Sequence, residues 1–134
     1  MLSDFRFHHI GYVTDSIPNT SAFYLQAGYN ATAIIEDGIQ RVHICFLTKD
    51  GFPRVELIAP IDELSSVNKL LKKSGVAPYH ICYEVDDIHE AFNELVEKQG
   101  YTPLFRPVEA IALDNRLICY LYRKELGFIE LVNK

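Results

Sequence analysis

The sequence lacks the features that are typical of secreted and membrane-bound proteins: paired cysteines, a signal peptide and a long apolar run. It contains 134 residues with no tryptophan, one methionine and three cysteines. An odd number of cysteines without an export signal predicts a reducing cytoplasm. The first residues, MLSDFRFHHIGYV, lack the basic stretch and apolar run of a signal peptide. No apolar run approaches the roughly 20 residues that a membrane-spanning helix needs, so we expect no membrane partner.

The sequence also lacks any cluster of basic residues. Its net charge is −5, and phosphate neutralisation requires clustered lysine or arginine, so nucleic acid is excluded as the main partner. The apolar fraction of 49% excludes a disordered or low-complexity chain. The length is that of a single domain, here spanning residues 1–134, which can bury a core without disulfides or structural zinc.

The chain repeats itself at an offset of 71 to 74 residues. The segment HIGY at 9–12 matches HICY at 80–83, ICFL at 44–47 matches ICYL at 118–121, and VELI at 55–58 matches IELV at 129–132. Several matches in the same order are hard to attribute to chance. We therefore expect one module at 5–60, a linker helix at 61–75 and a second module at 76–134.

Each module has the pattern of a strand, a helix and three further strands. The first is predicted to have strands at 7–13, 31–36, 40–48 and 54–59, with a helix that begins after Ser16 and ends at Gly28. The second is predicted to have strands at 78–85 and near 103–108, 115–122 and 127–132, with a helix from Asp87 to Gly100. The predicted fold class is α+β: two tandem βαβββ modules forming one curved mixed sheet. Helices lie outside, and the cup inside is the expected ligand site.

Four polar residues interrupt the apolar centres of these strands: His9, Glu56, His80 and Glu130. A buried, unpaired carboxylate is costly. A lone strand histidine is more often a core residue, and a lone strand glutamate usually faces solvent, but these four form repeat-related pairs. A pseudo-twofold axis would bring two imidazoles and two carboxylates together, with a charge of −2 that balances one divalent cation. Mixed nitrogen and oxygen ligands suit Zn, Mn, Co, Ni or Fe(II).

Neighbouring residues offer weaker alternatives. His8 could exchange roles with His9, but only His9 has a repeat partner. Cys45 and Cys119 are also repeat-equivalent, yet they lie among apolar neighbours, where cysteine usually acts as a small hydrophobic residue. A thiolate nucleophile is therefore not expected.

The repeat with His, Glu, His and Glu at these positions resembles the vicinal oxygen chelate superfamily, which includes glyoxalase I, fosfomycin resistance proteins and extradiol dioxygenases. Within it, the sequence is most similar to the methylmalonyl-CoA epimerase family. Three segments carry this similarity: SSVNKLLKKSGVAPYHICYEVDDIHEAFNEL, VELIAP and GFIELV. The loop AIALDNRL differs from the glycine-rich loop usual in those epimerases. The resemblance implies that the four polar residues bind one divalent metal ion (Zn, Co, Ni or Mn) and that the protein forms a homodimer.

The resemblance also implies a reaction in which a proton leaves a carbon beside a carbonyl and a metal ion stabilises the enolate oxygen. Glu130 is the predicted base, and His43 is the predicted second proton-transfer group, with Glu56 as its competitor. Arg116 is the predicted contact for the phosphates of a coenzyme A tail. The lysines of 61–75 are more typical of a solvated helix face.

Three other functions share this fold. Bacterial glyoxalase I (lactoylglutathione lyase) has an equally similar ligand set and acts on a glutathione hemithioacetal instead of a thioester. A ligand-sequestering protein of the bleomycin-resistance type lacks the His and Glu ligands. A dioxygenase needs a redox-active metal and usually three protein ligands. The sequence therefore favours a metal-dependent isomerase or lyase that acts on a small thioester or hemithioacetal.

Overall fold

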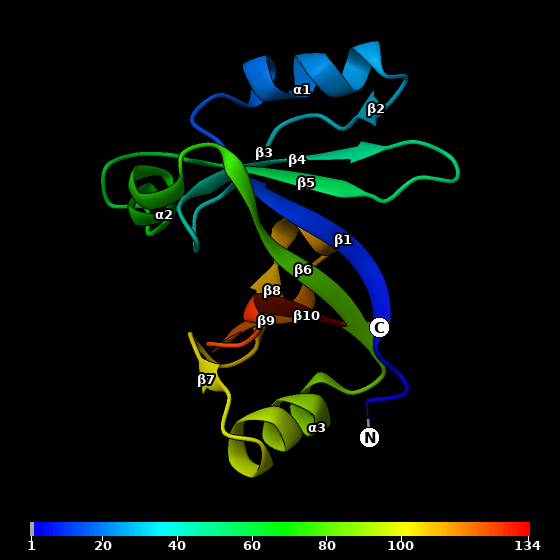
Figure 1. Ribbon diagram of the computed structural model, residues 1–134, viewed down its shortest axis with the longest axis vertical. Helices are drawn as coiled ribbons and strands as arrows, with labels where there is room; N and C mark the ends of the chain where they lie inside the picture. The colour runs from blue at the N-terminus through cyan, green and yellow to red at the C-terminus, as the bar shows by residue number, and fades with distance from the viewer. Residues whose placement is uncertain (1) are drawn as a thin grey trace. The chain divides into compact units, whose positions relative to one another are not determined.

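In a computed structural model, which describes residues 2–134, the chain divides into two units. One unit comprises residues 9–79, and the other comprises residues 80–134 with the N-terminal residues as far as His8. Each unit contains a strand, a helix and then further strands, in the predicted βαβββ order. The predicted α+β class is confirmed (Figure 1).

The unit of residues 9–79 contains a mixed sheet in the strand order β2-β4-β5-β1, in which β3 also pairs with β4. Only β1 and β5 are parallel; β4 is antiparallel to its neighbours β2, β3 and β5. The strands are β1 (Arg6–Val13), β2 (Asn30–Ala31), β3 (Ile35–Asp37), β4 (Val42–Thr48) and β5 (Val55–Pro60).

The unit that contains residues 80–134 has the same plan, with the strand order β6-β10-β9-β7 and β8 paired with β9. Again a parallel pair, β6 and β10, is followed by antiparallel partners. The strands are β6 (Ala77–Val85), β7 (Thr102–Pro103), β8 (Val108–Ala110), β9 (Arg116–Arg123) and β10 (Gly127–Asn133). Both units therefore form a parallel pair between the first and last strands of their modules.

The second strand of each module is broken where we predicted a continuous one. In the first module, the hydroxyl of Thr32 accepts a hydrogen bond from the amide of Phe46 and donates one to the carbonyl of Ala33. The Thr32 hydroxyl thus replaces a backbone carbonyl as the acceptor for an amide of β4, and this interruption of the backbone pairing separates β2 from β3. In the second module, Pro103 and Pro107 have no amide hydrogen to donate to a neighbouring strand, which separates β7 from β8.

The helices of the two units begin and end near the predicted residues. α1 (Ile17–Gln26) is capped by the hydroxyl of Ser16 and ends before Gly28, which has a φ of +91° that favours glycine. α3 (Ile88–Asn93) is capped by Asp87, whose carboxylate accepts two backbone N–H groups, and continues as a π-helical turn (Glu94–Lys98).

The linker helix is shorter than predicted. α2 spans only Val67–Ser74, whereas the apolar spacing predicts a helix over 61–75. A turn precedes it, because the carboxylate of Asp62 accepts the amide of Leu64 and the carbonyl of Asp62 accepts the amide of Ser65. A side chain that bonds to the backbone in this way competes with helix formation.

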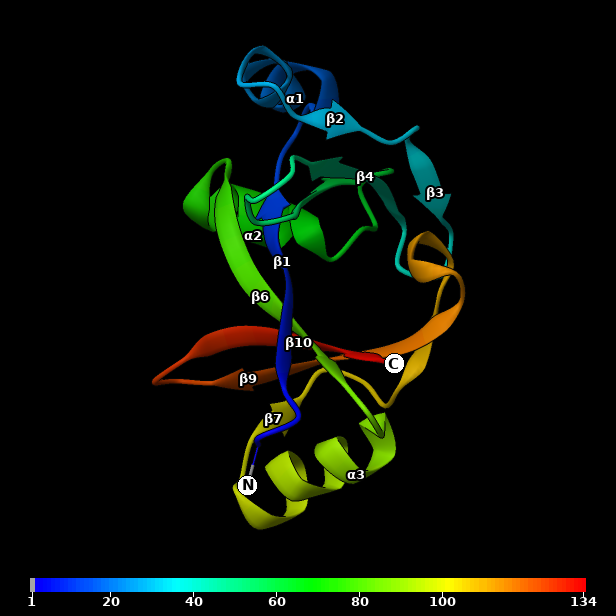
Figure 2. The same ribbon diagram turned by 90° about the vertical axis from the view of Figure 1, so that its right-hand side faces the viewer.

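One face of each sheet carries a hydrophobic core beneath a helix. α1 lies on one side of β4 and β5, over a cluster of Ile17, Cys45, Leu47, Val55, Leu57 and Ala59. α3 lies on one side of β9 and β10, over a cluster that contains Cys119, Leu121, Ile129 and Leu131 (Figure 2). Side chains alternate along a strand, so the intervening residues of β4, β5, β9 and β10 lie on the opposite faces.

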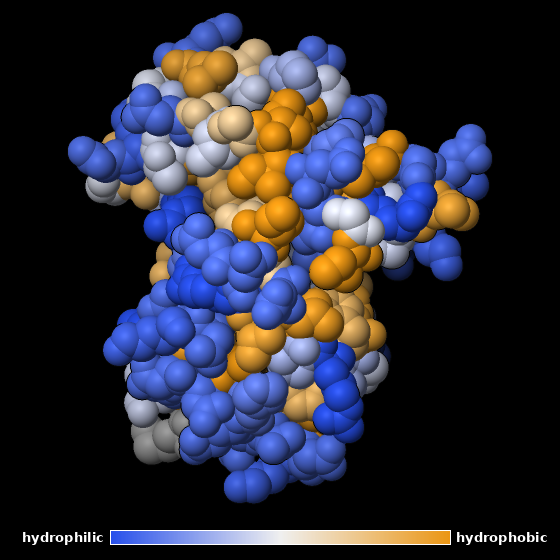
Figure 3. Space-filling view, turned by 180° about the vertical axis from the view of Figure 1, so that it is seen from behind, coloured by the Kyte–Doolittle hydropathy of each residue, from blue (hydrophilic) through white to orange (hydrophobic). Residues whose placement is uncertain are grey.

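The surface carries hydrophobic side chains among hydrophilic ones, as the face in Figure 3 shows. Across the described residues, the most exposed large hydrophobic side chains include Phe23, Ile39 and Leu64. None of the helices in residues 2–134 is both long and apolar enough to cross a membrane.

Candidate functional site

His9 and Glu56 form a buried pair within the unit of residues 9–79. In the parallel pair of β1 and β5, Glu56 is the register partner of Gly11, two residues after His9. Because side chains alternate, His9 and Glu56 lie on the same face of the sheet. Nε2 of His9 is 3.2 Å from Oε1 of Glu56, and the residues are 0% and 3% exposed.

His80 and Glu130 form the equivalent pair within the other unit. Glu130 on β10 is the register partner of Cys82, two residues after His80 on the parallel strand β6. Nε2 of His80 is 3.1 Å from Oε1 of Glu130, and the residues are 4% and 2% exposed. The four polar residues predicted from the repeat thus form two pairs of the same geometry.

An aromatic ring lies against the histidine of each pair. Phe46 is directly opposite Glu56 in the antiparallel ladder, and its ring meets that of His9 edge-on, with centroids 5.5 Å apart at 81°. Tyr120 is directly opposite Glu130, and its ring meets that of His80 edge-on, with centroids 5.1 Å apart at 88°. Sequence reasoning assigned no role to these two residues, although the match of ICFL with ICYL already made them equivalent.

The donor atoms of each pair suit a divalent cation. Two ligand atoms bound to one ion at about 2.1 Å are about 3.0 Å apart at a right angle and about 3.4 Å apart at the tetrahedral angle. The measured separations of 3.2 and 3.1 Å fall in this range. A cation would also offset the cost of burying the carboxylate in each pair. Each half of the predicted ligand set therefore fits a metal.

His43, the predicted second proton-transfer group, has a different setting. It is opposite Ala59 in the register of β4 and β5, one residue from Ile44 and three from Phe46. Alternation therefore places His43 on the opposite face of β4 from Phe46 and Glu56. Its side chain is 40% exposed, with Nε2 3.5 Å from a carboxylate oxygen of Glu36. The structure does not bring His43 to the His9–Glu56 pair within their unit.

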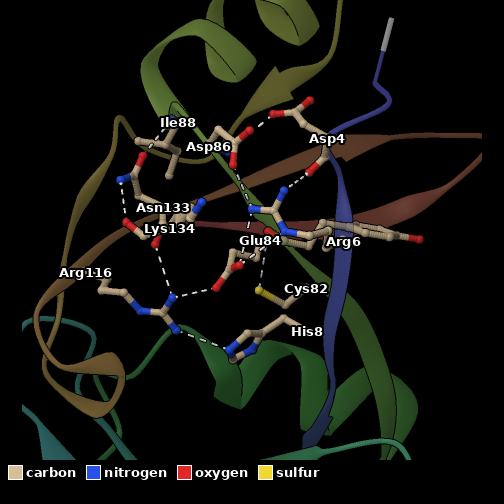
Figure 4. A network of polar contacts seen from close by, with 11 residues as sticks. Asp4, Arg6, His8, Cys82, Glu84, Asp86, Ile88, Arg116, Asn133 and Lys134 are labelled. Carbon is tan, nitrogen blue, oxygen red and sulfur yellow. Dashed lines mark hydrogen bonds and ion pairs between the residues drawn. The ribbon is translucent and has the colours of Figure 1, made fainter.

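Arg116, the predicted phosphate contact, lies in a network of polar contacts in its own unit (Figure 4). Its guanidinium donates hydrogen bonds to Oε2 of Glu84 at 2.9 Å and to the carbonyl of Asn133 at 3.3 Å. Another of its nitrogens lies 3.2 Å from Nε2 of His8. The hydrogen bond from Arg116, together with a second from Arg6, holds the pKa of Glu84 below its usual range. The role of Arg116 in substrate binding stays a prediction.

The cysteines are buried and poorly suited to act as nucleophiles. Cys45, Cys82 and Cys119 are all buried. Burial, together with the nearby charge of Glu130, raises the pKa of Cys119 to about 12. Burial also raises the pKa of Cys45. Since the thiolate is the reactive form, these residues act as small core side chains.

Comparison with known protein families identifies one match across most of the chain. The model of the Glyoxalase/Bleomycin resistance protein/Dioxygenase superfamily matches residues 8–120. Among curated proteins, the mitochondrial methylmalonyl-CoA epimerase of Dictyostelium discoideum is 30% identical over 86 residues, or 60% of this chain and 49% of the relative. The chain therefore spans about half the length of that relative.

Solved structures of similar fold include an enzyme and a protein of unassigned function. A hypothetical protein from Bacillus halodurans C-125 has a TM-score of 0.85 and 25% identity, covering 97% of this chain and 94% of its own. A variant of Streptomyces coelicolor methylmalonyl-CoA epimerase in complex with 2-nitronate-propionyl-CoA has a TM-score of 0.80 and 26% identity, covering 96% of each chain.

Proposed function

The chain belongs to the Glyoxalase/Bleomycin resistance protein/Dioxygenase superfamily, and we propose that it is a metal-dependent epimerase of the methylmalonyl-CoA type. The epimerases among its relatives in sequence and fold support this substrate class. The proposed reaction removes the proton from the carbon beside the thioester carbonyl and returns it to the opposite face.

The observation that carries the proposal is the pair of buried His–Glu contacts at repeat-equivalent positions. Separations of 3.2 and 3.1 Å in both units match ligand atoms that share an ion. We propose that His9, Glu56, His80 and Glu130 together hold one divalent ion. Such an ion supplies a Lewis acid that stabilises negative charge on the substrate oxygen.

The protein's own groups must move the proton. We assign Glu130 as the base, since a carboxylate in an apolar strand is shielded from water, which strengthens its interaction with the reacting carbon acid. An epimerase needs a second proton-transfer group at the opposite face of the α-carbon. Glu56 stands in the same relation to its histidine as Glu130 does, whereas His43 lies on the other side of β4. We therefore place Glu56 before His43 for this role.

Arg116 is proposed to contact the phosphates of the coenzyme A tail. Its guanidinium already donates to Glu84, so a phosphate would have to compete with that carboxylate. Arginine remains well suited to this contact because its planar guanidinium can bind two phosphate oxygens at once. The resemblance further predicts a homodimer, which light scattering of the purified chain would test.

Hydrogen exchange at the α-carbon tests the proposed function. The purified protein, loaded in turn with Zn, Co, Ni or Mn, is incubated with methylmalonyl-CoA in D₂O, and deuterium at the α-carbon is measured by mass spectrometry. We expect deuterium to enter the α-carbon with the metal-loaded protein and not with the metal-free protein. Absence of exchange with every metal would overturn the assignment.

Lactoylglutathione lyase activity is the competing function, because its ligand set is equally similar. The same metal-loaded samples are therefore assayed with methylglyoxal and glutathione. Turnover of this hemithioacetal without exchange in methylmalonyl-CoA would reverse the order of the two functions. We expect deuterium exchange in methylmalonyl-CoA and no turnover of the hemithioacetal.

A further inference from the structure

The two halves of the proposed metal site differ in one hydroxyl group. Phe46 and Tyr120 are repeat-equivalent, and both are 7% exposed. Each lies opposite a proposed carboxylate ligand and meets a proposed histidine ligand edge-on. The phenol oxygen of Tyr120 has no counterpart on Phe46.

The ring of Tyr120 is held on two sides. His80 contacts it with centroids 5.1 Å apart, and Phe105 contacts it with centroids 5.9 Å apart at 65°. Tyr120 also shares a sheet face with Glu130, because directly opposite residues in an antiparallel ladder project to the same side. The ring that carries the hydroxyl thus packs against the histidine partner of the proposed base and shares a sheet face with that base.

We propose that the Tyr120 hydroxyl donates a hydrogen bond to the thioester oxygen of the substrate. This inference rests on the proposed function. The thioester oxygen gains negative charge as the α-proton leaves, and a fixed donor at that position stabilises the transition state more than the ground state. Phe46, the repeat equivalent in the other unit, offers no such donor.

The variant Y120F tests this role by removing one oxygen while keeping the ring. We expect Y120F to bind one metal ion per chain, as the parent protein does. Its kcat for deuterium exchange at the α-carbon of methylmalonyl-CoA should be about 10- to 100-fold lower than that of the parent, and its KM should stay within about twofold of the parent value. Y122F, on an exposed tyrosine of the same strand, is the matched control and should keep the parent kcat.

A binding measurement complements the kinetics. The probe is 2-nitronate-propionyl-CoA, whose planar anionic group resembles the charge of an enolate. Calorimetry on metal-loaded protein should give a Kd about 10-fold higher for Y120F than for the parent. The double variant Y120F/F46Y places a hydroxyl in the other half, and it should remain as slow as Y120F.

Several results would overturn the inference. A parent-like kcat and probe affinity in Y120F would show that the hydroxyl does not contact the substrate. Loss of metal in Y120F would show that Tyr120 supports His80 instead. Recovery of kcat in the double variant would show that the hydroxyl is not required at Tyr120 itself. Absence of exchange in the parent protein would overturn the proposed function itself, and the inference with it.

Discussion

Arg116 donates a 2.9 Å hydrogen bond to Glu84, and the two side chains are 29% and 26% exposed (Figure 4). Arg6 contacts the same carboxylate at 3.3 Å. Glu84 therefore lies between two guanidinium groups from different strands and links β9 and the N-terminal part of β1 to β6. Both cations favour the ionised carboxylate, which makes the stability of this unit depend on pH.

Glu84→Gln should lower the free energy of unfolding by about 1 kcal/mol at pH 7. The pKa of Glu84 in the folded state is below its ordinary value of 4.5, so its contribution to stability is present above that value. The contribution is lost as the pH falls through the folded-state pKa. Urea unfolding at pH 7 and pH 3 should show the difference between parent and variant shrinking at the lower pH.

Glu109→Gln is the control for that experiment, because Glu109 is exposed on β8. It should change stability by less than about 0.5 kcal/mol at either pH. A difference between parent and Glu84→Gln that stays constant from pH 7 to pH 3 would contradict the ionic origin of the effect.

His80→Ala should abolish stoichiometric metal binding. One imidazole ligand and the partner of Glu130 are removed together, which leaves an incomplete donor set. Elemental analysis of purified parent protein should find about one divalent ion per chain, and the variant should have lost it. His89→Ala, at an exposed position, should keep the parent content. Unchanged metal in His80→Ala would rule out the ligand assignment.

The cysteines should resist alkylation in the folded protein. All three are buried, and the pKa of Cys119 of about 12 leaves almost no thiolate at pH 8. Iodoacetamide labelling followed by mass spectrometry should find no modification under native conditions and three modified cysteines in urea. Rapid native labelling of Cys119 would show that its environment is more open than its burial indicates.

Asp37→Ala should destabilise the turn between β3 and β4. The Asp37 residue is 1% exposed, and its carboxylate accepts the amides of Ile39 and Gln40 and the side-chain amide of Gln40. Removing these acceptors should lower the free energy of unfolding by about 2 kcal/mol. Asp37→Asn retains one acceptor oxygen and should lose less, as measured by urea unfolding. Equal losses in both variants would indicate that charge matters more than the hydrogen bonds.

Much of the fold could be predicted because the signals are local. The helix that begins after Ser16 and ends before Gly28 follows from a cap and a glycine that act on adjacent backbone. Tertiary contacts are harder to predict. The break between β2 and β3 depends on Thr32 bonding to Phe46 on another strand. The short α2 has a local cause, the turn at Asp62, which the apolar spacing alone does not reveal.

The sequence by itself determined the βαβββ repeat and the unusual polar positions His9, Glu56, His80 and Glu130. Periodicity and repetition are properties of the chain, and they require no knowledge of which strands meet. Only the tertiary structure decided that each histidine lies within 3.2 Å of its glutamate and that Tyr120 and Phe46 contact those histidines. It also placed His43 on the other face of β4. These relationships depend on strand register, which is set by pairing between segments far apart in the chain, where a shift of one residue reverses every side chain.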